Sequence, residues 1–159
     1  GPDAGQLLAV GAALRCQQIA GALGRLVAMT TQYALDRTQF GRPIGKFQAV
    51  QHNLAVLAGQ AAAATAAADG AAEAIAPLRL LPIAAAKQRC GEAAGAGAAI
   101  AHQVHGAIGF TYEHSLHYLT KRLWSWRDEF GNEAEWAALL GRHLAAAGPD
   151  RLWSGITAA

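Results

Sequence analysis

Apolar side chains recur every three or four positions over the first part of the chain, from Gln6 to about Asp36. This spacing places them along one side of a helix with about 3.6 residues per turn. The sequence therefore predicts one long amphipathic helix over these residues. The side chains that set the pattern are Leu7, Leu8, Val10, Leu14, Ile19, Leu23, Leu26, Val27 and Met29.

Glycine and proline divide the rest of the chain into further helical stretches. The Gly/Pro cluster at 41–45 interrupts helical geometry, so we expect a second helix from about Lys46 to about Ile75. Gly148 and Pro149 stop the last helix, and a loose tail is expected after them. The helices after the second are predicted over about 82–105, 115–129 and 132–147.

Three glycines, Gly91, Gly95 and Gly97, fall inside the third predicted helix. Each weakens a helix by about 1 kcal/mol relative to alanine, so their presence needs another reason. Without a β carbon they allow close contact between helices. We expect them to form a packing seam.

The composition favours helices throughout the chain. Hydrophobic residues make up 53% of it but aromatic residues only 7%, and alanine dominates. Alanine leads the helix scale, whereas strands prefer β-branched and aromatic residues. We predict an all-α fold, an up-down four-helix bundle with an additional short C-terminal helix over 1–148, followed by a C-terminal tail at 149–159.

The charge pattern argues against two classes of partner. The formal net charge is +2 with 15% charged residues, too few and too dispersed for a nucleic-acid surface. No apolar run approaches about 18 residues without a polar break, so no membrane span is expected. Cys16 and Cys90 fall within predicted helices and are interpreted as buried thiols of a protein from the reducing cytoplasm.

A polar constellation surrounds the Gly/Pro cluster. It consists of Arg37, Phe40 and Gln48. A guanidinium can pair with two phosphate oxygens at once, and an amide side chain both donates and accepts hydrogen bonds. These groups fit the pyrophosphate or sugar region of a dinucleotide. The alternative is structural, with Arg37 capping the first helix and the phenylalanine anchoring the turn.

A second candidate segment lies at the end of the third predicted helix. There Gln103 precedes the small-residue turn that begins at Gly106. The backbone at a glycine can approach a ligand closely, and a neighbouring amide can reach the same ligand. An ordinary helix stop would have the same appearance.

Taken together, the runs 33–48 and 103–111 closely resemble the C-terminal helical domain of the acyl-CoA dehydrogenases. The resemblance covers nearly the whole chain. It rests on the order, spacing and type of residues in Tyr33-Ala34-Leu35-Asp36-Arg37, Gln39-Phe40-Gly41-Arg42-Pro43-Ile44, Phe47-Gln48, Gln103-Val104-His105-Gly106 and Gly109-Phe110-Thr111.

The resemblance implies an oxidoreductase of lipid metabolism, in fatty acid or sterol degradation. Members use FAD to convert an acyl-CoA to a trans-2-enoyl-CoA: a Glu removes the α-proton and flavin N5 takes the β-hydride. Each subunit has an N-terminal helical domain, a middle β-domain and this C-terminal domain, usually within a tetramer. The acyl-chain specificity cannot be read from this segment.

The resemblance also assigns cofactor contacts. By matching position, Arg37, Phe40 and Gln48 contact the pyrophosphate and adenosine part of the FAD of a neighbouring subunit. Gln103 and Gly106 match a Gln-x-x-Gly-Gly stretch that reaches the same FAD. The second glycine of that stretch is Ala107 here.

Neither of the two positions at which the family carries its catalytic Glu holds a carboxylate in this chain. In most relatives it lies in the loop after the fourth helix, at the position of Phe130; in a smaller group it lies on the first helix, at the position of Gly11. Neither residue can abstract a proton. Glu129 would reach the first position only if the loop shifted by one residue.

Three explanations follow for the missing Glu. The resemblance implies a homo- or hetero-oligomer with another acyl-CoA dehydrogenase subunit. The favoured explanation is a heteromer, as in actinobacterial relatives, in which this chain shares the FAD contacts, the partner carries the Glu and this chain alone is inactive. Alternatively Glu129 acts after a local shift, or the fold serves a non-redox role. A rival function is a stand-alone helical oligomerisation module that binds no flavin.

Other polar and aromatic groups have simpler interpretations. His102 with His105, and His114 with His117, are spaced for one helical face, but the sequence offers no further ligands, so we predict no metal site and treat them as polar helix-end residues. The acidic side chains of Asp128, Glu129, Glu133 and Glu135 are interpreted as a solvated helix start, with paired carboxylates as the alternative. Trp124, Trp126 and Trp136 are expected in the core, with a partner surface as the alternative.

Overall fold

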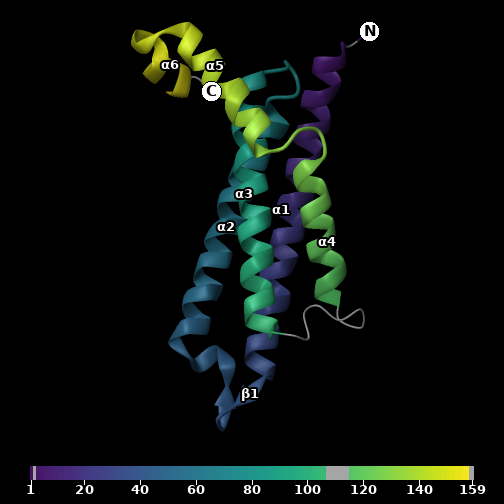
Figure 1. The fold of residues 1–159 in the computed structure, drawn as a ribbon, viewed down its shortest axis with the longest axis vertical. Helices are drawn as coiled ribbons and strands as arrows, with labels where there is room; N and C mark the ends of the chain where they lie inside the picture. Colours follow the sequence, from purple (N-terminus) through teal and green to yellow (C-terminus); the bar gives the residue numbers. More distant parts are fainter. Residues whose placement is uncertain (2, 107–114, 158–159) are drawn as a thin grey trace.

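Four helices lie side by side in an elongated bundle (Figure 1). The structure is a computed structural model that describes residues 1, 3–106 and 115–157. The helices run alternately up and down, which confirms the predicted all-α bundle. They are α1 (Ala4–Asp36), α2 (Gln48–Glu73), α3 (Leu80–His105) and α4 (Ser115–Asp128).

α1 begins at a capping box and ends where the chain becomes extended. The Asp3 side chain accepts a hydrogen bond from the Gln6 amide at 2.8 Å, and the Gln6 side chain accepts one from the Asp3 amide at 3.0 Å. This exchange satisfies two amides that an uncapped helix start leaves unpaired. Arg37 follows the last helical residue with φ −78° and ψ 119°.

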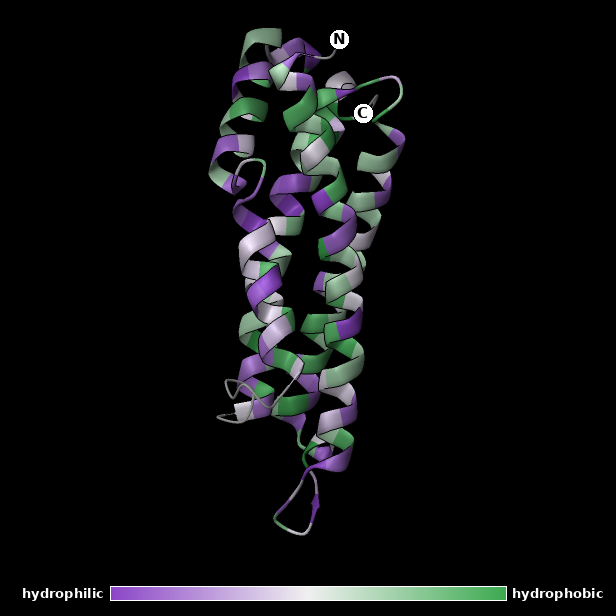
Figure 2. Cartoon of the chain, turned by 90° about the vertical axis from the view of Figure 1, so that its right-hand side faces the viewer, coloured by the Kyte–Doolittle hydropathy of each residue, from purple (hydrophilic) through white to green (hydrophobic). Residues whose placement is uncertain are grey.

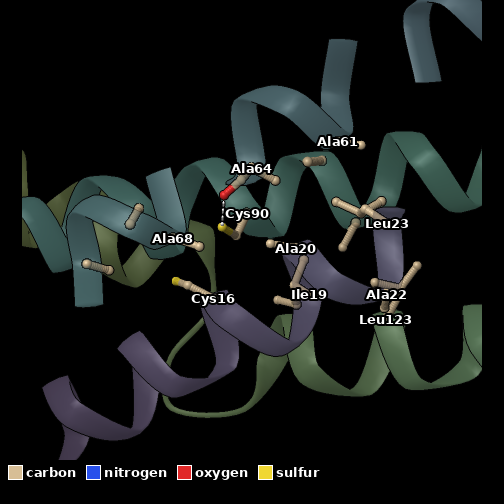
Figure 3. Close-up of a cluster of buried hydrophobic side chains, with 14 of the residues drawn as sticks. Cys16, Ile19, Ala20, Ala22, Leu23, Ala61, Ala64, Ala68, Cys90 and Leu123 are labelled. Carbon is tan, nitrogen blue, oxygen red and sulfur yellow. Dashed lines mark hydrogen bonds between the residues drawn. The ribbon is translucent and has the colours of Figure 1, made fainter. Parts of the chain in front are cut away.

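The core consists largely of alanine and a few leucines (Figure 3). Cys16 and Cys90 are both buried in it, as predicted, and the Cys90 thiol donates to the Ala64 carbonyl oxygen at 3.5 Å. The small side chains allow α1, α2 and α3 to lie close together. Other residues at 0% exposure include Ile19, Leu23, Leu26, Leu57, Ala64, Ala68, Ile83 and Leu123.

The glycines of α3 form the packing seam that the sequence predicts. A β carbon on Gly97 would lie 2.6 Å from Leu23 Cδ2, and one on Gly91 would lie 2.7 Å from the Glu133 side chain. Gly95 faces Arg127 in the same way, at 3.0 Å. These glycines therefore leave space for side chains of the neighbouring helices.

α1 is long and apolar enough to cross a membrane, judged by length and composition alone. Half of its most apolar stretch is buried among the other helices, as in the central helix of a bundle. Figure 2 shows hydrophobic and hydrophilic residues alternating along each helix.

The segment between α1 and α2 is more ordered than the turn expected from its glycines and proline. Two short strands, β1 (Thr38–Gln39) and β2 (Arg42–Pro43), pair antiparallel and form a hairpin at one end of the bundle (Figure 1). Phe40 and Gly41 between them have φ 53° and 79°, the signature of a type I′ turn. A 3₁₀ turn, η1 (Ile44–Lys46), follows, so the second helix begins at Gln48 rather than near Lys46.

The C-terminal part differs from the expected loose tail. After α5 (Glu133–Ala147) come a 3₁₀ turn, η3 (Pro149–Arg151), and a short helix, α6 (Leu152–Thr157). Pro149 is the first residue of η3, where its missing amide costs nothing. No residue of α6 is buried, and Trp153 is 74% exposed.

Candidate functional site

The hairpin end of the bundle carries a groove between two segments that are distant in the sequence. Arg37 approaches from the end of α1, whereas Gln103 and Gly106 lie at the end of α3. The groove has a volume of about 410 Å³. Its other lining residues are Tyr33, Gln39, Ile44, Val104 and His105.

A second groove of about 330 Å³ adjoins the first and contains Phe40. Four residues, Gln39, Ile44, Gln103 and Val104, line both grooves. Phe40 is 93% exposed at the tip of the hairpin, so its ring stabilises little of the bundle itself. The residues that line only the second groove are Phe40, Phe47, Ala49, Val50 and Asn53.

A small separate core fixes the hairpin against α1 and α3. It contains the buried residues Ala34, Ile44 and Val104. Gly45 presses against α1, because a β carbon there would lie 3.1 Å from the Ala34 carbonyl oxygen. The Ile44 amide donates to the Arg37 carbonyl oxygen at 2.8 Å. The backbone beneath the grooves is therefore held from both sides.

Tyr33 and His105 connect α1 to α3 beside the first groove. Their rings stack with centroids 4.3 Å apart, and the Tyr33 hydroxyl donates to the His105 carbonyl oxygen at 3.3 Å. The His105 ring nitrogen Nδ1 lies 2.8 Å from the Ala101 carbonyl oxygen. These contacts fix the spacing between the two walls of the groove.

The Arg37 guanidinium is exposed and makes no hydrogen bond or ion pair within residues 3–106 and 115–157. The cap at the end of α1 comes instead from the Arg37 backbone amide, which donates to the Tyr33 carbonyl oxygen at 2.9 Å. The guanidinium is therefore available to pair with an anionic ligand in the groove.

Gly106 meets the geometric requirement for close approach by a ligand. Its φ is 63°, in the left-handed region that favours glycine. A β carbon there would meet no atom of the described residues within 4 Å. Among the described residues, the space in front of this position is thus open.

The structure brings most but not all of the expected contact residues together. Arg37, Gln103 and Gly106 share the first groove, and Phe40 and Gln103 share the second. Gln48 lies exposed at the first position of α2, next to Ala49 but outside both sets of lining residues. Expectations for Ala107, Gly109, Phe110, Thr111 and His114 fall outside the described residues.

Several lining residues were not singled out from the sequence. Tyr33 precedes Arg37 by one helical turn and shares its face, a spacing that could have indicated it. The pairing of Gln39 with Arg42 across a two-residue ladder left no periodic signal in the sequence.

A second region of interest is the turn between α4 and α5, away from the hairpin end (Figure 1). The Phe130 ring lies directly on Gly11 of α1: a β carbon on Gly11 would come within 2.8 Å of Phe130 Cγ. The two positions at which the sequence comparison looked for a catalytic Glu therefore lie in contact. Neither carries a carboxylate.

Glu129, the shifted candidate, points to other partners. Its Oε1 accepts a hydrogen bond from the Ser125 hydroxyl at 2.9 Å, and its Oε2 accepts one from Arg15 Nε at 2.6 Å. The Ser125 hydrogen bond and the Arg15 contact hold the pKa of Glu129 below its usual value. A general base for α-proton abstraction requires the opposite shift.

The histidines are more deeply placed than helix-end residues were expected to be. His102 and His105 are 6% and 3% exposed. His102 Nε2 lies 2.9 Å from the Thr120 hydroxyl, and burial, followed by the charge of His117, lowers the pKa of His102. Over the described residues no group of three or more His, Cys, Asp or Glu is arranged to hold a metal ion.

The acidic stretch and the tryptophans divide between core and surface. Glu133 is ion-paired with Arg127 and only 16% exposed, in contrast to the solvated helix start that was expected. Glu135 takes part in the capping box of α5 with Asn132. Trp136 is buried as predicted, Trp126 is partly buried, and Trp124 is 41% exposed, contrary to a core position.

Comparisons with known proteins agree with the resemblance. The family profile described as acyl-CoA dehydrogenase, C-terminal domain, matches residues 3–133. Acyl-CoA dehydrogenase IpdE2 of Mycobacterium tuberculosis is 40% identical over 121 residues, which cover 76% of this chain and 37% of that protein.

Two solved structures share the fold over most of this chain. Glutaryl-coenzyme A dehydrogenase in its glutaryl-CoA complex gives a TM-score of 0.81 at 25% identity, covering 86% of this chain and 35% of that one. The ChsE4-ChsE5 complex from Mycobacterium tuberculosis gives 0.75 at 31% identity, covering 87% and 38%. The chain spans little more than a third of these relatives. Because the family profile extends over most of its length, the chain belongs to the acyl-CoA dehydrogenase family and corresponds to its C-terminal domain.

Proposed function

We propose that this chain completes the FAD site of a neighbouring subunit in an acyl-CoA dehydrogenase that introduces an α,β double bond into an acyl-CoA. The observation that carries the proposal is the convergence of Arg37, Gln103 and Gly106 on one groove from the ends of two helices. FAD, when bound, supplies the acceptor for the hydride that leaves the β carbon.

In this proposal each of the five candidate contact residues has a role that suits its side-chain or backbone chemistry. The exposed Arg37 guanidinium pairs with pyrophosphate oxygens, and the Gln103 amide donates to or accepts from the adenosine portion. Gly106 allows the ligand to approach the backbone. The exposed Phe40 ring offers an apolar face to the nucleotide, and Gln48 contacts it from the start of α2.

The proton is removed by a carboxylate of another subunit. In this chain the Phe130 ring occupies the space on Gly11, and Glu129 is engaged by Ser125 and Arg15. A heteromer is supported by the similarity to the ChsE4-ChsE5 complex, which is an assembly of two named components.

The outer face of α2 supports an assembly of helical domains. Between Gln51 and Ala68 this helix carries no Asp, Glu, Lys or Arg, although one side of it is exposed. A solvated protein surface usually carries about 25–35% charged residues. Small side chains on this face allow another helix to approach closely. The exposed positions include Ala55, Val56, Ala58, Gly59, Ala62, Thr65 and Ala66.

The test is an FAD titration of the complete subunit assembled with its partner, for the unchanged protein and for Arg37→Ala and Gln48→Ala. Loss of a charge-assisted hydrogen bond should weaken FAD binding roughly tenfold to a hundredfold in Arg37→Ala, and loss of a neutral one about fivefold in Gln48→Ala. Arg142→Ala, an exposed arginine of α5, is the control and should bind FAD normally. Equal affinity of Arg37→Ala and the control would contradict the proposal.

The second candidate function is a helical oligomerisation module that binds no flavin. The uncharged face of α2 and the exposed α6 favour it as a source of contacts. The same titration separates the two functions, because a module would bind FAD in no assembled form.

A further inference from the structure

A buried lysine holds the turn that carries Phe130. Lys87 of α3 is 0% exposed, although charged side chains are rarely buried completely. Its ammonium donates to the Arg127 carbonyl oxygen at 2.7 Å and to the Gly131 carbonyl oxygen at 2.6 Å. One side chain thus joins the end of α4 to the residue just before the cap of α5.

Burying this ammonium is costly, which points to a specific purpose. Burial is the main influence on it and lowers the pKa of Lys87. The ionisable groups whose charges act on it are Cys16 of α1, Cys90 of α3, Asp128 of α4 and Glu133 of α5, and its own charge acts in turn on Glu129. An apolar side chain would fill the same space without a desolvation cost.

The turn that Lys87 holds has an unfavourable backbone. Phe130 has φ 58°, a conformation that bulky residues rarely adopt, and Gly131 has φ 91°. Such a conformation persists only where the surroundings over-determine it. Besides the two bonds from Lys87, the Trp136 indole donates to the Phe130 carbonyl oxygen at 2.8 Å.

The register of this turn decides which side chain lies over Gly11. Phe130 lies over Gly11, whereas the neighbouring Glu129 is turned toward Arg15 and Ser125. A shift of the turn by one residue would bring the carboxylate toward Gly11. Bonds to carbonyls on both sides of Phe130 oppose that shift, since they would have to break together.

We infer that Lys87 is a positioning residue that fixes the register of the turn, so that Phe130 and not Glu129 lies over Gly11. This inference rests on the proposed function, in which the place over Gly11 is that of the missing base. Lys87 thereby keeps the carboxylate away from the site, and the aromatic ring closes it.

Nuclear magnetic resonance of this chain tests the inference without flavin. The α-protons of Gly11 lie against the Phe130 ring, so their resonances should show a ring-current shift. The difference in these resonances between the unchanged protein and Phe130→Leu gives the size of that shift. We expect Lys87→Met to lose most of the same shift while the amide resonances of α2 stay in place. Lys46→Met, an exposed lysine of η1, is the control and should keep the shift. An unchanged Gly11 shift in Lys87→Met overturns the inference.

A second measurement applies if Lys87→Met is too unstable for this comparison. Glycine adopts a positive φ without strain. In Phe130→Gly the turn therefore no longer contains the strained residue that Lys87 is inferred to hold in place. We expect the loss in the folding equilibrium constant caused by Lys87→Met to be at least about fivefold smaller in the Phe130→Gly background. Equal losses in the two backgrounds overturn the inference. Neither measurement involves FAD, so failure of the flavin titration leaves them unaffected.

Discussion

At the scale of single residues, Glu129 shows how local partners set the chemistry of a side chain. Its pKa is lowered by the Ser125 hydroxyl and by Arg15. A carboxylate with a depressed folded-state pKa contributes stability above its unfolded pKa, and that contribution is lost as the pH falls through the folded pKa. The group is therefore ionised at neutral pH and committed to its neighbours.

Arg15→Gln should move the pKa of Glu129 upward, toward its ordinary value. The substitution removes the positive charge but leaves the Ser125 hydrogen bond, so the shift should be only partly relieved. Titration of the Glu129 carboxyl carbon by NMR measures the change. A Glu129 midpoint that does not rise in Arg15→Gln would show that this ion pair does not form in solution.

The family resemblance, which rests on the order, spacing and type of residues, selected Arg37, Gln103 and Gly106 as candidate contacts. Their proximity depends on α1 and α3 running in the same direction, so that both helices end near the hairpin, as the up-down order of a four-helix bundle requires. The contact between Gly11 and Phe130 could not be foreseen from spacing alone. It depends on a left-handed residue in a turn, and local sequence gave no signal for that conformation at a phenylalanine.

At the scale of helices and strands, the long periodic segments were predicted well and the short ones poorly. α1 and α3 agree with the apolar pattern because each buries a continuous stripe. The hairpin and α6 are too short to show a period, and they depend on turn geometry and on contacts with α1 and α5. Thus the scaffold was predictable, whereas the irregular segment that lines the candidate site was not.

Two helical glycines, Gly97 and Gly24, allow the close helix packing to be tested by alanine substitution. Gly97→Ala should destabilise the bundle, because its β carbon would lie 2.6 Å from Leu23 Cδ2 in a close-packed core. Overpacking of this kind costs about 1–3 kcal/mol, more than the gain of up to about 1 kcal/mol in helix propensity.

Gly24→Ala is the matched control for that substitution. Gly24 is an exposed helical residue with no atom within 4 Å of an added β carbon, so alanine should raise the free energy of unfolding by up to about 1 kcal/mol. Urea unfolding of the two variants provides the comparison. Equal stability changes in Gly97→Ala and Gly24→Ala would contradict the close contact between α1 and α3.

At the scale of the whole molecule, the two ends of the bundle have different roles in the proposed assembly. The hairpin end presents an exposed arginine and an exposed phenylalanine to a cofactor held by another subunit. The α4–α5 turn closes the place of the missing base. Between them runs the uncharged face of α2, which would join the bundle to its neighbour and so bring the cofactor to the grooves.

Ala62→Lys tests whether that face is an interface. Ala62 is exposed in the single chain, so a lysine there can extend into water and should leave the fold of the bundle unchanged. Within an assembly the ammonium would be forced between packed helices without a partner, and sedimentation should show dissociation of the complete protein. FAD affinity should fall with it, because Arg37 would then be separated from the subunit that holds the cofactor. Ala138→Lys on the exposed side of α5 should leave both unchanged. An intact assembly in Ala62→Lys would place the interface elsewhere, and the uncharged face of α2 would then need another occupant.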